Sequence, residues 1–187
     1  ELLSKGLLRT FQIAHEFTNL SVLENLMMVP GNQSGEKLMQ VLLKPKLIAE
    51  EETILKEKAK EVVDFLNLSH LSNELAGNLS GGQKKLLELG RTMMVDAKLV
   101  LLDEVGAGVN RTLLKDLGTA IEKLNKEKGY TFCMIEHDMD FIGRLCDPVI
   151  VMAEGSVLFE GTVEDAKKDE RVIESYLGRG SKLKDKN

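Results

Sequence analysis

A glycine-rich string in the middle of the chain constrains the fold more than any other feature. The string Leu79-Ser80-Gly81-Gly82-Gln83 opens directly into a stretch with helical periodicity. Two glycines let the backbone approach an anion closely, and the first N–H groups of a helix carry a partial positive charge. An ordinary glycine-rich helix start is the plainer interpretation, but this string, with the Ser80 hydroxyl beside the glycines, favours a loop that contacts phosphate.

Further along, the apolar run Leu99-Val100-Leu101-Leu102 ends in two adjacent carboxylates, Asp103 and Glu104. Such a run is typical of a strand buried on both faces of a parallel sheet. In open parallel sheets, ligands bind beyond the carboxyl ends of the strands. One carboxylate there can hold Mg²⁺ through waters, and the second can polarise an attacking water. Solvated acids at a helix start would give the same pattern, so this string alone leaves both interpretations open.

The composition excludes some classes of function. A chain of 187 residues is long enough for one domain with an inserted subdomain. The formal charge of −5 and the 4% of aromatic residues, without Trp, argue against a nucleic-acid surface. No apolar run reaches the roughly 18 residues that span a bilayer. Cys133 and Cys146 lack a Cys-x-x-Cys spacing, which favours a reduced cytosolic setting.

The first half of the chain is mostly helical by pattern. An extended apolar segment from Gly6 to Gln12 precedes a helix start at which Ser21 and Glu24 form a capping box. Helical periodicity follows over residues 49–66 and again over residues 83–94. The residues expected on the buried face of the first of these helices are Ile54, Leu55, Ala59, Val62, Val63 and Leu66.

The second half alternates strands and helices, which predicts a parallel sheet. The expected elements, in order, are a buried strand over 98–103, a helix over 111–128, a buried strand over 131–135, a helix over 138–145, a hairpin around Glu154-Gly155, and short helices over 163–168 and 171–177.

Two further polar residues follow extended segments. Gln12 ends the first apolar segment, and taken alone it reads as a surface amide. His137 comes after the strand over 131–135, and a lone histidine is more often structural than catalytic. Because parallel strands end at the same edge of a sheet, however, His137 and Glu104 are expected near one rim. A neutral histidine there could hydrogen-bond a terminal phosphate.

Together these strings resemble those of ATP-binding-cassette ATPases. The matching positions, in the family's order and approximate spacing, are Gln12, Leu79 to Gln83, Leu99 to Glu104, Gly106-Ala107-Gly108-Val109-Asn110 and His137. Finer strings are similar to the ATP-binding subunits of branched-chain amino acid importers and their urea or amide relatives: Arg9-Thr10-Phe11-Gln12, Ile135-Glu136-His137-Asp138-Met139 and Tyr176-Leu177-Gly178. The resemblance covers the chain from its start to about Gly178.

The resemblance implies ATP and Mg²⁺ as cofactors and assigns roles around them. Gln12 would be the loop glutamine that meets Mg²⁺ and the attacking water and couples to the membrane subunit. Asp103 would support Mg²⁺. Glu104 would be the catalytic carboxylate, and His137 the catalytic switch histidine.

The resemblance also implies a partner ATPase subunit. Ser80, Gly81, Gly82 and Gln83 would contact the γ-phosphate of ATP bound to the opposite subunit, and the segment from Ala107 to Asn110 would cross the dimer interface. Transmembrane permease subunits would be the other partners, and nucleic acid would not be one. The protein would be cytoplasmic and peripheral on the inner face of the cell membrane.

The expected fold is α/β, a P-loop NTPase-like parallel sheet core that lacks its phosphate-loop strand and carries an inserted helical subdomain. Residues 1–16 would hold the end of a core strand and the glutamine loop. Residues 17–94 would form the helical subdomain with the glycine string. Residues 95–178 would complete the α/β core, and residues 179–187 would be a disordered tail.

The serious departure from the family is that no Gly-x-x-x-x-Gly-Lys-Ser/Thr loop occurs in the 187 residues. The favoured explanation is that these residues are a truncated piece of an importer ATPase. A degenerate subunit that binds a partner without hydrolysing ATP is an alternative, although Glu104 and His137 are retained. A DNA-repair or translation ATPase is another, against which the acidic charge and the Tyr176-Leu177-Gly178 string argue.

Two expectations follow from the missing loop. The polypeptide alone should have no ATPase activity. The strand over 131–135 should have an open edge, so the chain should self-associate there or cover that edge with rearranged segments.

Overall fold

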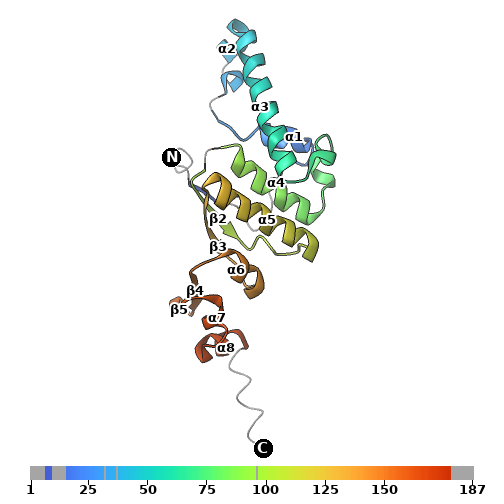
Figure 1. Cartoon of the computed structure of the whole chain (residues 1–187). Coiled ribbons are helices and arrows are strands. Elements are labelled where there is room, and N and C mark those ends of the chain that lie inside the picture. The colour runs from blue at the N-terminus through green and yellow to red at the C-terminus, as the bar shows by residue number, and fades with distance from the viewer. Residues whose placement is uncertain (1–6, 10–15, 32, 37, 96, 178–187) are drawn as a thin grey trace, which may run out of the picture. The chain divides into compact units, whose positions relative to one another are not determined.

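The computed structural model describes residues 7–9, 16–31, 33–36, 38–95 and 97–177 (Figure 1). The chain divides into two compact units, Glu1–Ile135 and Glu136–Asn187, and each is a body of its own. Gln12 lies outside the described residues. No helix in the described part of the chain is long and apolar enough to cross a bilayer.

The first unit contains a parallel three-stranded sheet. Its strands are β1 (Leu7–Arg9), β2 (Leu99–Asp103) and β3 (Thr131–Ile135), in the order β1-β2-β3. Leu7 pairs with Leu99, and Asp103 pairs with Ile135 at the other end of the sheet. The helix α5 (Arg111–Lys128) connects β2 to β3, as a crossover between parallel strands requires. The predicted α/β class with a parallel sheet is therefore confirmed.

The chain between β1 and β2 is helical. Its elements are α1 (Val22–Met27), η2 (Ser34–Glu36), α2 (Leu38–Leu43), α3 (Pro45–Phe65), η3 (Ser69–Leu71), η4 (Ala76–Asn78) and α4 (Gly81–Met93). Helices α1, α3 and α4 pack against one another (Figure 1). The large side chains that are fully buried include Leu26, Val63, Leu87 and Met94. These side chains come from successive helices, so one apolar core holds the helical part together.

Local capping chemistry sets the ends of several helices. The Ser21 side chain accepts a hydrogen bond from the Glu24 N–H, and the Glu24 carboxylate accepts one from the Ser21 N–H, which confirms the predicted capping box. Asn110 caps the start of α5, and Gly129 ends it in the left-handed region at a φ of 71°. The predicted bounds of α5 are therefore confirmed.

Helix α3 differs from the prediction at its start. It begins at Pro45 rather than at Ala49, because proline is well suited to the first turn of a helix, where its missing N–H is not needed. Ile54 was expected in the core but is 67% exposed. The buried residues of α3 begin at Ala59, and none of its residues before that point is buried. As a whole, the helix packs on α1, α2, α4, η2 and η3.

The two central strands are less buried than predicted. In β2 only Val100 and Leu102 are buried, and the other three residues of the strand are half-buried. In β3 alternate residues are exposed, and Ile135 is 63% exposed. Burial on both faces needs a layer of helices on each side, and β3 is an edge strand among the described residues. No described strand pairs with the outer side of β3, in agreement with the predicted open edge. Self-association there and cover by rearranged segments stay predictions.

The second unit is a small α/β body. Its elements are α6 (Met139–Leu145), β4 (Val149–Ala153), β5 (Ser156–Gly161), α7 (Val163–Ala166) and α8 (Glu170–Leu177). Strands β4 and β5 are antiparallel, and the turn between them places Glu154 and Gly155 at positive φ, as two-residue hairpin turns require. The predicted hairpin is confirmed. Ile142, Val149 and Val163 form the core of this unit.

Candidate functional site

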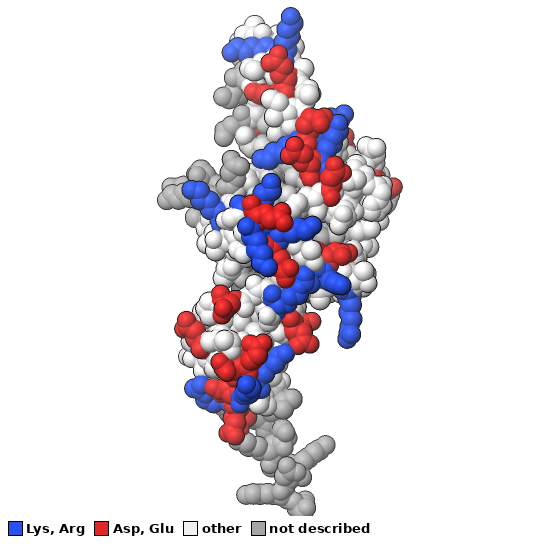
Figure 2. Space-filling model, in the orientation of Figure 1, with Lys and Arg blue, Asp and Glu red and all other residues white. Residues whose placement is uncertain are grey.

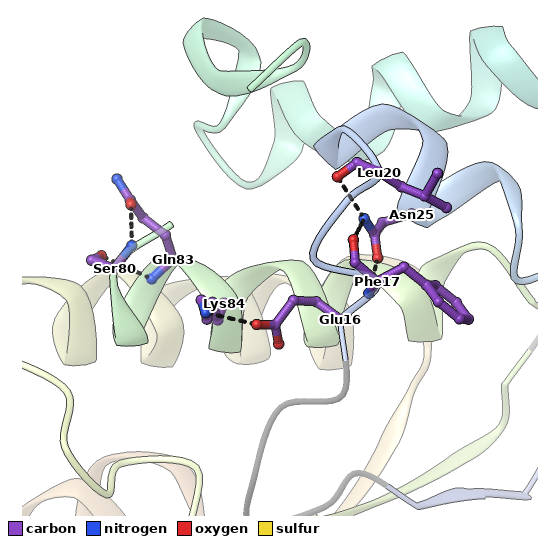
Figure 3. A network of polar contacts seen from close by, with 7 residues as sticks. All are labelled: Glu16, Phe17, Leu20, Asn25, Ser80, Gln83 and Lys84. Carbon is purple, nitrogen blue, oxygen red and sulfur yellow. Dashed lines mark hydrogen bonds and ion pairs between the residues drawn. The ribbon is translucent and has the colours of Figure 1, made fainter. Parts of the chain in front are cut away.

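The glycine string forms the start of α4. Ser80 is the N-cap residue, and its N–H donates to Gln83 Oε1 at 2.9 Å (Figure 3). The Gln83 N–H donates back to Ser80 Oγ at 3.4 Å, which completes a capping box. The N–H groups of Gly81 and Gly82 come before this point, where a helix offers no partner of its own. The helix start therefore presents the donors that an anion needs.

The two glycines lie close to other parts of the chain. A Cβ atom on Gly82 would come within 2.6 Å of Leu113 Cδ1 and within 2.9 Å of Leu113 Cβ, in the first turn of α5. A Cβ atom on Gly81 would lie 3.7 Å from the carbonyl oxygen of Gly108. The glycine string thus packs directly beside the loop that follows β2, and Gly82 is required for this close approach.

The two carboxylates end β2 and begin that loop. Asp103 is the last residue of the strand and is half-buried. Glu104 adopts a φ of 46°, which a residue with a side chain rarely does. Its N–H donates to the Ile135 carbonyl at 2.9 Å, and its carbonyl accepts from the Ala107 N–H at 3.1 Å. The loop is therefore held at the carboxyl end of the sheet, where ligands bind in parallel α/β folds.

An ion pair links α4 to the segment that precedes α1. Lys84 Nζ lies 2.7 Å from Glu16 Oε1 (Figure 3). The Glu16 side chain is only 9% exposed, and within the described part of the chain its second carboxylate oxygen is buried without a hydrogen-bond partner. Lys84 follows Gln83 directly, so this pair fixes the first turn of α4 to the chain around Glu16.

Asn25 holds the same segment from its other side. Its side chain is fully buried. Its Oδ1 accepts from the Phe17 N–H at 2.8 Å, and its Nδ2 donates to the Phe17 carbonyl at 3.0 Å (Figure 3). The same nitrogen donates to the carbonyls of Leu20 and Ser21. The Asn25 amide thus forms hydrogen bonds with several backbone groups of the turn that leads into α1.

A second ion pair lies on the inner side of α4. Lys85 Nζ is 3.7 Å from Glu88 Oε2, and both side chains are almost completely buried. They line a small cavity together with Leu102 and Val105, the neighbours of the two carboxylates of β2. Helix α4 therefore packs against the strand end that carries Asp103 and Glu104.

His137 belongs to the second unit, just before α6. It is exposed, and its carbonyl accepts from the Tyr176 hydroxyl at 3.2 Å. The next residue, Asp138, caps α6 by accepting from the N–H groups of Asp140 and Phe141. The backbone of His137 is thus held between α6 and α8.

The donor set fits the ligands that the sequence implies. Asp103 and Glu104 offer carboxylate oxygens, which Mg²⁺ prefers, and the start of α4 offers N–H and hydroxyl groups, which phosphate prefers. Among the described residues, no cluster of three or more His, Cys, Asp or Glu side chains surrounds a single point.

Comparison with known proteins identifies the family. The family model described as ABC transporter matches residues 1–107. The chain is 42% identical over 178 residues to the probable branched-chain amino acid transport ATP-binding protein LivG of Archaeoglobus fulgidus, covering 95% of this chain and 68% of that protein. It is 40% identical to the protein of the same name from Methanocaldococcus jannaschii, covering 95% of this chain and 70% of that one. The chain belongs to the ABC transporter family.

Solved structures of this family agree with the fold. A nucleotide-free ATP-binding cassette from an ABC transporter superposes with a TM-score of 0.76 at 38% identity, covering 95% of this chain and 70% of that one. The ABC transporter fold is thus shared over nearly the whole chain. ATP hydrolysis is the activity that the family implies for the full-length protein.

Sequence reasoning missed three residues that hold the site in this ABC transporter chain: Glu16, Lys84 and Asn25. Only Asn25 left a signal, because an amide among the apolar residues of α1 marks a buried polar group that needs partners. Glu16 and Lys84 are far apart in sequence, and nothing local connects them.

Proposed function

We propose that the chain is the ATP-binding and ATP-hydrolysing subunit of an importer for branched-chain amino acids. The observation that carries this proposal is the packing of the glycine string against the loop that follows Glu104. The printed names of the most similar relatives support the cargo. The subunit is cytoplasmic, lies on the inner face of the membrane, and works with a second ATPase subunit and with transmembrane permease subunits.

Each site residue has a role in this proposal. Ser80, Gly81, Gly82 and Gln83 bind the γ-phosphate of ATP held by the second subunit. The N–H groups of Gly81 and Gly82, for which the helix start offers no partner of its own, support this role. Catalysis then rests on positioning and on charge neutralisation.

The carboxylate side of the site serves the chain's own nucleotide. Gln12 and Asp103 would hold Mg²⁺, which would supply positive charge against the phosphates. Glu104 polarises the attacking water, and His137 donates a hydrogen bond to the γ-phosphate. Gln12 also transmits the nucleotide state to the permease.

The 187 residues contain no phosphate loop with its lysine. We therefore expect this polypeptide alone to be inactive toward ATP, and its glycine string to complete the ATP site of a partner. Importer ATPases need both halves of each composite site, so the activity of this chain depends on that partner.

A complementation assay tests the proposal. The chain is mixed with a full-length relative whose own glycine string has been inactivated, and hydrolysis of Mg-ATP is measured. Hydrolysis should be absent for either protein alone and should appear in the mixture. It should disappear with Ser80→Arg in this chain and persist with Ser156→Arg, which places the same charge on an exposed residue of the second unit.

Two results would contradict the proposal. One is a mixture that stays inactive although the two proteins associate. The other is hydrolysis by this chain alone that is abolished by Glu104→Gln, because such activity would need no partner.

A further inference from the structure

The end of the helical part that lies away from α4 exposes large apolar side chains. We name Met39, Val41, Leu42, Leu43 and Leu47 the α2–α3 tip. Leu42 is 78% exposed, Leu43 is 70% exposed and Met39 is 67% exposed. All five residues belong to α2 or to the first turns of α3, which pack on each other and on η2 (Figure 1).

This exposure is unusual for a helix in water. A surface helix normally has one apolar stripe facing the core and a polar opposite face. In α2, however, Val41, Leu42 and Leu43 are consecutive, so they point to different sides of the helix, and all three are exposed. Neighbouring exposed apolar side chains of this kind mark a surface that binds a partner.

The charges around the α2–α3 tip indicate what kind of partner binds this surface. The stretch from Leu38 to Ala49 contains Lys44 and Lys46, both exposed, and no carboxylate. The nearest acidic residues in sequence, Glu36 and Glu50, flank this stretch. Figure 2 shows blue atoms at the outer end of this region, with red atoms beside them and further along the helical part. A chain with a net charge of −5 thus combines apolar and basic groups at one end of its helical part.

We infer that the α2–α3 tip inserts into the interface of an anionic lipid membrane. Leu42, Leu43 and Met39 would enter the boundary between headgroups and acyl chains, as the apolar face of an interfacial helix does. Lys44 and Lys46 would lie along the surface with their ammonium groups among anionic headgroups. This contact is independent of the proposed ATPase function, since it needs neither nucleotide nor permease.

A second copy of the chain fits the tip less well. A stable protein interface buries about 800 Å² on each partner and is built around a well-packed core. The five side chains of the tip, from a helix of six residues and the first turns of the next, are all exposed and form no packed apolar core of their own. Two copies of the tip would also bring like-charged lysines together, whereas an anionic membrane neutralises them.

Vesicle co-sedimentation of the whole chain tests the inference. The vesicles contain either phosphatidylcholine alone or phosphatidylcholine with phosphatidylglycerol. The chain should bind the anionic vesicles at least tenfold more tightly, and raising the salt concentration should weaken that binding. Leu42→Ser with Leu43→Ser should reduce the binding at least tenfold, and Lys44→Glu with Lys46→Glu should reduce it by a similar factor.

Matched variants separate the tip from general surface effects. Ile150→Ser with Met152→Ser removes exposed apolar side chains from the second unit, and Lys126→Glu with Lys128→Glu reverses two exposed charges on α5. Both should bind anionic vesicles within about twofold of the unchanged chain. Circular dichroism checks that every variant is folded.

Three outcomes would overturn the inference. Equal binding to both kinds of vesicle would show that Lys44 and Lys46 do not contribute through attraction to anionic headgroups. If a control pair of substitutions reduced vesicle binding as much as the tip substitutions do, the binding would not depend on the tip. Leucine substitutions that shift the oligomeric state in sedimentation velocity, without changing vesicle binding, would assign the tip to a second copy.

Discussion

The two ends of the helical part are built in opposite ways. At the root, which we define as Glu16, Asn25, Ser80, Gln83 and Lys84, polar side chains are engaged with one another or with the backbone (Figure 3). At the α2–α3 tip, apolar side chains are exposed to solvent. The root holds a fixed geometry beside the glycine string, whereas the tip offers surface that the chain itself does not use.

This difference indicates that the root contributes to stability and the tip to binding. A buried amide with several partners is expensive to disturb, because each lost contact leaves a polar group without water or protein. An exposed leucine contributes almost nothing to the folded state. Substitutions at the root should therefore change the free energy of unfolding, and substitutions at the tip should change only what the chain binds.

The largest effect is expected at Asn25. Asn25→Leu keeps the approximate volume but removes the acceptor of the Phe17 N–H. It also removes one hydrogen bond from each of three carbonyl groups, which keep a backbone N–H partner. The free energy of unfolding should fall by about 3 kcal/mol in urea denaturation. Asn73→Leu, at an exposed asparagine of the same helical part, should change it by less than about 0.5 kcal/mol. Equal losses of stability at both positions would show that the root contributes no more to stability than an exposed position does.

A smaller effect is expected at Gly82. Gly82→Ala places a methyl group against Leu113, including its Cβ, which cannot move without the backbone of α5. The resulting overpacking should lower the free energy of unfolding by about 2 kcal/mol, even though alanine favours helix formation. Gly81→Ala meets only an ordinary contact and should be neutral or stabilising by up to about 1 kcal/mol. Thermal or urea unfolding of the two variants measures this difference in the free energy of unfolding.

Substitutions at the α2–α3 tip should hardly change the free energy of unfolding. Leu42→Ser with Leu43→Ser removes apolar groups that are already in water, so the free energy of unfolding should change by less than about 0.5 kcal/mol. A loss of several times that amount would mean that the tip is packed in solution, and the contrast between root and tip would then fail.

The smallest effect concerns an exposed polar pair outside both regions. Hydrogen bonds from Arg171 lower the pKa of Asp169 from 3.8 to about 2. Since the folded chain binds this proton less readily than the unfolded chain, the pair stabilises α8 above about pH 3.8, and that contribution is lost as the pH falls toward 2. Titration of the Asp169 carboxyl group by NMR should show the low midpoint. Arg171→Ala should raise the midpoint toward 3.8 without reaching it, because the backbone N–H groups of residues 171 and 172 still donate to the carboxylate. Lys168→Ala should leave the midpoint unchanged.

Local chemistry explains which parts of the fold the sequence predicted. The capping box of Ser21 and Glu24, the bounds of α5 and the hairpin at Glu154-Gly155 depend on residues that are close in sequence, and all three are confirmed. The parallel class followed from the alternation of strands and helices. The packing of Gly82 on Leu113 explains why the string needs glycine, which the motif alone did not reveal.

Burial and long-range pairing were not predictable in the same way. The exposure of Ile54 and of Ile135 depends on which elements lie over them, and an apolar pattern says only that a residue could be buried. The pair of Glu16 and Lys84 joins segments that only the fold brings together. The roles of Asp103, Glu104 and His137 stay predictions, as does the role of Gln12, which lies outside the described residues.

The pairing of β1 with β2 has a consequence for the order of folding. Leu7 lies beside Leu99, so the whole helical part is a loop that must close before these strands can meet. Closing a long loop is entropically unfavourable, and it becomes easier once α1, α3 and α4 have condensed and brought its ends together. We therefore expect the helices to form first and the sheet last. Until β1 pairs, β2 has one open edge even when β3 is in place. At this stage of folding the chain is most exposed to pairing with other chains.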